Sequence, residues 1–303
     1  MIVGGIPMLL GGGGYSGPAK AIFGYGGGPV SITNLVSSTG VVSTDVTGVG
    51  TARSGLAAAP YGTDKAIFGY GVSPPSYTSI TNLVSNTGVV SADTSGVGTA
   101  RSSLAAAGYG TDKAIFGYGV HSAEPEVLLS LTNLVSNTGV VSADTSGVGT
   151  ARASLAAAGY GTDKAIFGYG ALLPGRVSIT NLVSNTGVVS ADTTGVGTER
   201  YNLAAASYGT DKAIFGYGEW ITLMSMTNLV SNTGVVAADV TGVGTARGAL
   251  AGTGYATDKA IFGYGYGGAN TAVTNLVSNT GVVSADTSGV GTARSSLAAA
   301  SVG

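Results

Sequence analysis

Few residues of this chain are of a type that does chemistry, and most of those recur at fixed positions of a repeat. The sequence holds one histidine, one tryptophan and no cysteine. All eleven aspartates, all six lysines and six of the seven arginines recur from one repeat to the next, which favours a structural role for them. The carboxylates outside the repeated set are Glu124, Glu126, Glu199 and Glu219.

Known catalytic and metal-binding arrangements do not fit these residues. Hydrolysis of a glycosidic bond needs two carboxylates that face each other across a sugar, and only the glutamates are candidates. A Ser-His-Asp triad would depend on His121, which we interpret as a surface residue, and zinc would lack ligands. The run Gly12–Gly17 does not have the spacing of a phosphate-binding loop. We therefore expect no catalytic residue, no metal and no cofactor, with calcium held by repeated aspartates as an alternative.

Charge and hydropathy predict the kinds of partner that the protein lacks. The net charge is −2, and each repeated lysine and arginine has aspartate nearby in sequence, so no basic stripe is expected for nucleic acid. The segment from Met1 to Gly14 has neither the basic start of a signal peptide nor a long apolar run. We expect no membrane insertion. A virion or extracellular surface is our working hypothesis for the location.

One repeat unit occurs six times along the chain. The motif KAIFGYG begins at Lys20, Lys65, Lys113, Lys164, Lys212 and Lys259. The motif TNLVS begins at Thr33, Thr81, Thr132, Thr180, Thr227 and Thr274. Each unit then carries GVGT, an arginine and a Leu-Ala-rich stretch. Because no linker interrupts the units, residues 1–303 are expected to form one domain.

Each unit predicts four short antiparallel strands and no helix. In the second unit these are 65–71, 79–85, 89–93 and 101–107, with Asn86, Thr87 and Gly88 as a tight turn between the second and third. Such sheets bury both faces only by stacking, so we predict an all-β, six-bladed β-propeller with four antiparallel strands per blade. A linear β-solenoid is the alternative. Residues 1–17 would then close the ring or dock on another subunit.

The order of these signals resembles the kelch repeat, as in ARSSLAAAGYGTDKAIFGYG and SITNLVSNTGVVSADTSGVGTAR. The double glycine of kelch is replaced by Gly-Tyr-Gly here, and the usual tryptophan of the third strand is absent. The resemblance implies a propeller. Repeats copied so closely are also similar to those of some bacteriophage tail and virion proteins.

Variation in length is confined to one connection of the repeat. The distance from Thr33 to Lys65 is 32 residues, and it is the same in all five such intervals. Only the segments between FGYG and TN differ, at 27–32, 72–80, 120–131, 171–179, 219–226 and 266–273. We call these segments the variable loops. In an up-and-down blade the first and third connections lie on the same face, so the variable loops should share one face.

Irregular loops on a rigid framework are how binding sites are commonly built. The sequence therefore predicts a non-enzymatic scaffold that recognises a glycan or a protein surface. The residues expected to contact it are Trp220, Tyr77, Tyr266, Arg176, Glu126 and His121. The alternative is that the sequences of these loops vary because no function constrains them. Two further alternatives are a purely structural block of a virion or tail, docked through the N-terminal segment, and a glycosidase-like propeller enzyme.

The repeated charges are expected to stabilise the blades. We predict that Asp93 pairs with Arg101, and that their equivalents pair likewise, across the connection between the third and fourth strands. The stretch from Ser91 to Gly96 resembles the Asp-box turn of sialidase propellers, but it has an extra residue before the glycine and lacks the aromatic that follows. We interpret it as a turn.

Overall fold

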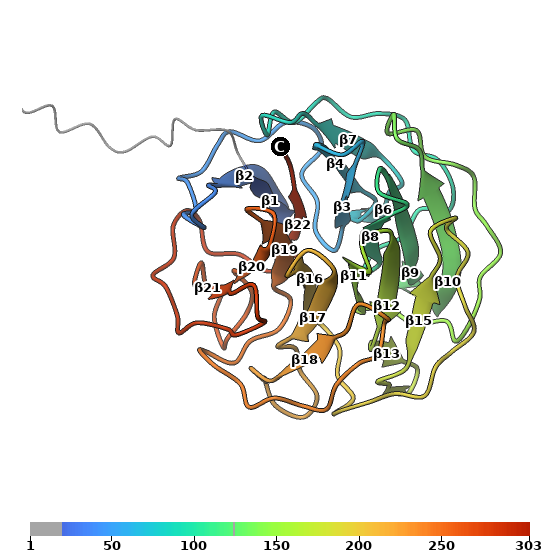
Figure 1. The fold of residues 1–303 in the computed structure, drawn as a ribbon. Helices are drawn as coiled ribbons and strands as arrows, with labels where there is room; N and C mark the ends of the chain where they lie inside the picture. Colours follow the sequence, from blue (N-terminus) through green and yellow to red (C-terminus); the bar gives the residue numbers. More distant parts are fainter. Residues whose placement is uncertain (1–19, 124) are drawn as a thin grey trace, which may run out of the picture.

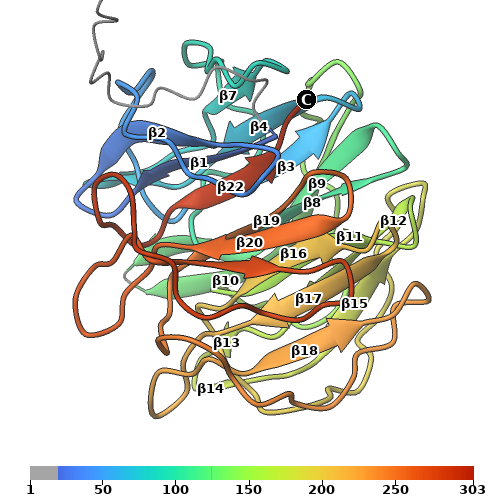
Figure 2. The ribbon, with the colours of Figure 1, turned by 60° about the vertical axis from the view of Figure 1, so that its left-hand side comes forward.

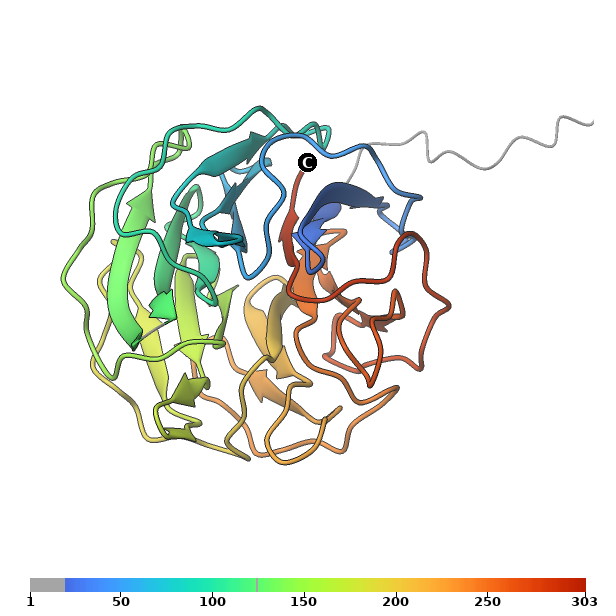
Figure 3. The same cartoon turned by 180° about the vertical axis from the view of Figure 1, so that it is seen from behind.

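Six blades stand in a closed ring in the computed structural model, which describes residues 20–123 and 125–303 (Figure 1). The all-β, six-bladed propeller predicted from the repeats is confirmed. Figure 3 shows the same ring from behind.

Each blade contains a three-stranded antiparallel sheet. Blade 1 consists of β1 (Ala21–Gly26), β2 (Val30–Val36) and β22 (Ala298–Ser301). Blade 2 consists of β3 (Ala57–Tyr61), β4 (Lys65–Gly69) and β7 (Thr81–Val84). Blade 3 consists of β8 (Ala105–Tyr109), β9 (Lys113–Ala123) and β10 (Glu126–Val135).

The other three blades repeat this order. Blade 4 consists of β11 (Ala156–Tyr160), β12 (Lys164–Gly168) and β15 (Thr180–Val183). Blade 5 consists of β16 (Ala204–Tyr208), β17 (Lys212–Gly216) and β18 (Thr227–Val230). Blade 6 consists of β19 (Ala251–Tyr255), β20 (Lys259–Gly263) and β21 (Thr274–Val277). Short hairpins, β5–β6 (Val72–Ser73, Ser76–Tyr77) and β13–β14 (Ala171–Leu172, Gly175–Arg176), lie in two variable loops.

The outer edge of each blade is an irregular segment. In blade 2 this segment meets β7 only at the isolated bridges Val84↔Val90 and Thr81↔Thr94. Three of the four predicted strands are therefore regular, and the predicted third strand, 89–93, is held by a few bridges.

The innermost strand starts later than the sequence predicts. We expected a strand over 101–107, but β8 runs from Ala105 to Tyr109. Arg101 lies in a buried network before the strand begins. Ser103 has a φ of 54°, in the left-handed region. This bend separates the arginine from the strand that follows it.

The C-terminal strand closes the ring. β22 pairs with β1 in antiparallel register, from Ala21↔Ser301 to Gly24↔Ala298. The innermost strands β22, β3, β8, β11, β16 and β19 follow one another around the centre (Figures 1 and 2). The inner strand of blade 1 is thus supplied by the end of the chain. The predicted closing or docking role of 1–17 lies outside the described residues.

The FGYG motif is explained by packing between blades. Phe116 is fully buried, and its ring meets the Tyr70 ring edge to face at 5.1 Å. A Cβ atom on Gly69 would lie 2.8 Å from Phe116, so this glycine makes room for the phenylalanine of the next blade. The same edge contact joins every neighbouring pair of blades, including Tyr264 to Phe23 where the ring closes.

Strand pairing places the variable loops on one face, as predicted. Gly69, at the end of β4, pairs with Ala57, where β3 starts, and with Thr81, where β7 starts. Thr81 also bridges Thr94, the end of the outer segment. The variable loop and the crossing to the next blade therefore lie at this end of the strands, and the Gly-Thr-Asp turn lies at the other.

Candidate functional site

A fully buried arginine stands between each pair of blades. Arg101 donates from Nε to the Tyr118 carbonyl oxygen (2.8 Å) and from Nη1 to the Thr99 carbonyl oxygen (3.0 Å). Its Nη2 donates to Asn133 Oδ1 (2.7 Å). The guanidinium also lies over the Tyr70 ring of the preceding blade, 4.3 Å from its centroid. The repeated arginines thus tie adjacent blades together.

The repeated aspartate completes this network. Asp144 accepts from the Thr99 amide (3.0 Å), from Thr99 Oγ1 (2.6 Å) and from Asn133 Nδ2 (2.9 Å). Its Oδ1 lies 4.0 Å from Arg101 Nη1. This clamp joins the crossing segment of one repeat to the outer segment of the next.

The predicted pairing of Asp93 with Arg101 is wrong. Arg101 lies against Asp144 of the next repeat, and Asp93 accepts from Thr51 of the preceding one. After the outer segment the chain crosses over to the inner edge of the following blade. Each arginine therefore meets the aspartate of the next repeat instead of its own.

Stability should depend on pH through these aspartates. Desolvation alone would raise the pKa of Asp93, but hydrogen bonds from Thr51 and Asn82 and the charge of Arg53 outweigh it and lower the pKa. The same holds at Asp45, Asp144, Asp192, Asp239 and Asp286.

A carboxyl with a lowered folded-state pKa stabilises the fold above its unfolded pKa, about 3.9, and loses that contribution as pH falls through the folded value. We expect the free energy of unfolding to hold down to about pH 5 and to drop below about pH 4. Urea titrations across this range check it. An Asp93→Asn variant should show a shallower acid slope, and an equal slope would contradict the assignment.

The framework tyrosines are structural. Tyr70 has a φ of 64°, and its hydroxyl donates to the Val97 carbonyl oxygen (3.1 Å). Burial raises the pKa of Tyr70 to about 12, although the Arg101 charge opposes this. The Tyr70 hydroxyl therefore stays protonated, and packing between the blades holds its strained backbone in place.

Four of the predicted contact residues lie on blades 2, 3 and 6. Tyr77 is half-buried on β6, and Tyr266 is 47% exposed. His121 is exposed on β9, with Nδ1 2.8 Å from the Ala100 carbonyl oxygen. Glu126, also on blade 3, is exposed at the start of β10. In the described part of the chain, no hydrogen bond, ion pair or ring contact joins any two of these residues.

The remaining predicted residues lie in the loops of blades 4 and 5. Arg176 is half-buried on β14, with its guanidinium 5.2 Å from the centroid of the Tyr201 ring. Trp220 is 38% exposed. Its neighbour Glu219 exchanges backbone hydrogen bonds with Tyr201 and accepts from Asn202 Nδ2 (2.5 Å). Tyr201 and Asn202 thus link the two loops.

Sequence reasoning missed Tyr201 and Asn202. Their signal was a departure from the repeat, which reads GTERYN at 197–202 where the second unit reads GTARSS at 98–103. The two residues belong to the constant interval, which we had interpreted as framework.

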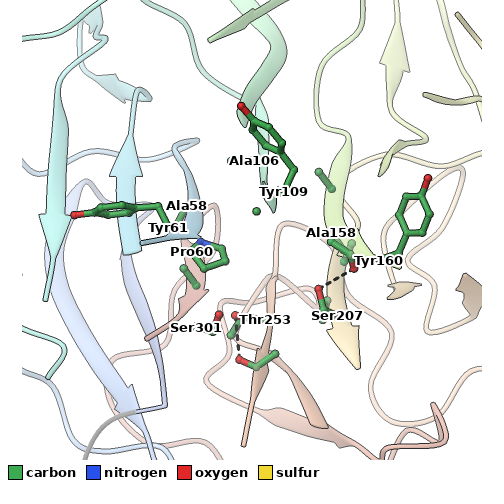
Figure 4. A pocket seen from close by; sticks show the side chains of 18 of the residues that line it. Ala58, Pro60, Tyr61, Ala106, Tyr109, Ala158, Tyr160, Ser207, Thr253 and Ser301 are labelled. Carbon is green, nitrogen blue, oxygen red and sulfur yellow. Dashed lines mark hydrogen bonds between the residues drawn. The ribbon is translucent and has the colours of Figure 1, made fainter. Parts of the chain in front are cut away.

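A central cavity of about 590 Å³ opens on the face opposite the variable loops. Many of its lining residues are small residues of the inner strands, among them Pro60, Ser207, Thr253 and Ser301 (Figure 4). The lining also includes Tyr61, Tyr109, Tyr160, Lys113 and Lys164. Ser207 Oγ donates to the Gly159 carbonyl oxygen of the neighbouring blade (2.9 Å). Among the residues that the structure describes, no Asp, Glu or His lines this cavity. This cavity has room for a small molecule, and its described lining offers hydroxyl and lysine groups but neither carboxylate nor imidazole.

A ring of leucines lines a second pocket at the variable-loop end of the innermost strands. A pocket of only about 90 Å³ is found there, lined by residues that include Leu56, Leu104, Leu155, Leu203, Leu250 and Leu297. These side chains are 5% or 6% exposed. The centre of the variable-loop face is therefore nearly closed, and its accessible features are the loops.

Comparison with solved structures defines the class of fold. The chain is similar to YjhT, with a TM-score of 0.65 over 90% of this chain and 98% of that chain, at 11% sequence identity. This similarity confirms a kelch-like propeller fold with six blades. No family model and no curated protein matches the sequence.

Two kinds of feature are absent from residues 20–123 and 125–303. No helix there is long and apolar enough to cross a membrane. That same part of the chain contains no group of three or more His, Cys, Asp or Glu side chains placed to hold a metal ion.

Proposed function

We propose that this protein is a non-enzymatic binding scaffold that recognises a protein or glycan surface through the variable-loop face. The observation that carries the proposal is the separation of the molecule into two parts. The framework repeats its buried arginines and tyrosines and its aspartates from blade to blade, whereas the connections differ in length only on one face and differ most in composition there. A rigid ring with different loops at one end is suited to recognition.

The composition of the loops supports this proposal over drift. The single tryptophan and the one arginine outside the framework lie there, and both residue types are enriched in binding hot spots. Trp220 and Tyr266 present part of their rings to solvent. Unconstrained loops would be expected to accumulate mainly glycine and serine.

A structural block of a virion or tail stays an untested alternative. It depends on the N-terminal segment, which lies outside the described residues, and the comparisons give no support for a phage origin.

Trp220→Ala tests the proposal. We expect it to cost about 2 kcal/mol of binding, because an aromatic anchor loses its contact area. Because the side chain is 38% exposed, stability should change by no more than about 0.5 kcal/mol. Wild type and variant are compared on a glycan array and on a panel of immobilised proteins and peptides. Binding by wild type that the variant retains in full would count against this site.

A further inference from the structure

The junction between blades 4 and 5 departs from the repeat in three of the four positions that flank and include the framework arginine. Glu199 stands where the other five repeats have alanine, at Ala52, Ala100, Ala151, Ala246 and Ala293. Tyr201 replaces serine, alanine or glycine, which occupy 54, 102, 153, 248 and 295. Asn202 replaces the serine, alanine or glycine of the other repeats. In a chain copied so closely, this cluster of changes in one place calls for a physical reason.

Two of the changed residues, Tyr201 and Asn202, contact the two variable loops beside them. Tyr201 lies under the Arg176 guanidinium, at 5.2 Å, and exchanges backbone hydrogen bonds of 3.0 and 2.9 Å with Glu219. Asn202 Nδ2 donates to Glu219 Oε1 (2.5 Å). Changes in the framework and changes in the loops are thus joined in one contiguous surface, which we call the 4–5 junction (residues 171–176, 199–202 and 219–221).

The Arg176 guanidinium is less fully hydrogen-bonded than the guanidinium groups of the framework arginines. The six framework arginines each donate to two backbone carbonyls and an asparagine, whereas the Nε atom of Arg176 is buried without a hydrogen-bond partner. No other buried side-chain nitrogen or oxygen in the described part of the chain is left in this state. The same part shows no ion pair of Arg176 with a carboxylate, and Glu219 is already bound to Asn202.

Apolar side chains are exposed in the same loops. Leu173 at the tip of β13–β14 is 55% exposed, Trp220 is 38% exposed and Ile221 is 76% exposed. The loops of blades 1 and 6, GGPVSI and YGGANTAV, are composed mostly of small residues. Exposed apolar side chains grouped around an arginine mark an interaction site, and tryptophan and arginine are enriched in protein interfaces.

We propose that the 4–5 junction docks a protein segment in which a carboxylate is flanked by apolar residues. The carboxylate would accept hydrogen bonds from the Arg176 guanidinium, and the apolar side chains would cover Trp220 and Ile221. This inference rests on the proposed function and narrows it, because it assigns the partner class and the part of the face.

The test uses two matched arrays of synthetic peptides. In the first, each peptide carries one Asp or Glu between apolar residues, and in the second, Asn or Gln replaces that acid. Wild-type protein is expected to bind members of the first array at least about tenfold better than their amide counterparts, and Arg176→Gln should abolish that difference. Ile221→Ser should weaken binding to both arrays.

Matched controls separate a local effect from a general one. Lys259→Gln removes a positive charge on the opposite face, and Val127→Ser removes an exposed apolar residue from the loop of blade 3. Both should bind as wild type does. The inference is overturned if no acidic peptide binds, if amide peptides bind equally well, or if Arg176→Gln binds acidic peptides unchanged. Binding only to glycans, lost when the loops of blades 2, 3 and 6 are replaced, would overturn this inference and leave the proposed function standing.

Discussion

Replacing Arg101 with methionine should lower the free energy of unfolding by about 3–5 kcal/mol, the cost of breaking a buried charged network. The side chain is fully buried between two blades. Its loss would leave the Tyr118 carbonyl oxygen and Asn133 Oδ1 without their donor, and Tyr70 without the guanidinium over its ring. Buried acceptors left unpaired cost more than the hydrogen bonds contribute on balance.

Arg176→Met is the matched control, since it is the same substitution at the arginine outside the framework. That variant should change stability by no more than about 0.5 kcal/mol. Arg101→Lys should fall between the two, because an ammonium group keeps the charge but lacks the planar fork of donors. Urea denaturation of the three variants measures the series. Equal destabilisation by Arg101→Met and Arg176→Met would contradict the division into framework and loops.

Replacing every variable loop with GGPVSI should remove binding and leave the ring intact. This sequence is the natural loop of blade 1, so it spans the same two strand ends that each of the other blades presents. The exchange leaves the 32-residue interval from each TN motif to the next lysine untouched, and that interval supplies most of the buried network. The exchange would remove all six predicted contact residues, namely Trp220, Tyr77, Tyr266, Arg176, Glu126 and His121.

The sequence was sufficient to predict the ring and the face that carries the loops. Repetition showed which residues are framework, and the constant interval located the variable connection. Because successive strands of a blade are antiparallel, those connections lie at one end of the blades, as the pairing of Gly69 with Thr81 shows.

The partner of each arginine could not be predicted in the same way. Because the repeats are nearly identical, an arginine has the same sequence context whether it pairs within its own unit or with the next. Only the path of the chain from the outer edge of one blade to the inner edge of the next decides that Arg101 meets Asp144. The late start of β8 has the same origin, since the buried network holds Arg101 outside the strand.

The candidate site was predictable in part. Loop variety identified Arg176 and Trp220, but it gave no information about which loops touch. Tyr201 and Asn202 were overlooked because they lie in an interval of constant length, where composition alone had changed. The central cavity follows from alanine, glycine and serine on the innermost strands, whose position in the ring depends on the order of strands in the sheet.

The most direct test of the division into framework and loops is a paired measurement on the six-loop exchange variant. Its free energy of unfolding and its affinity for the first binder identified on the glycan and peptide arrays are compared with those of wild type. We expect the free energy of unfolding to change by less than about 2 kcal/mol, as for surface substitutions summed over several sites, and binding to be lost. Binding that survives the exchange in a folded protein would contradict the account.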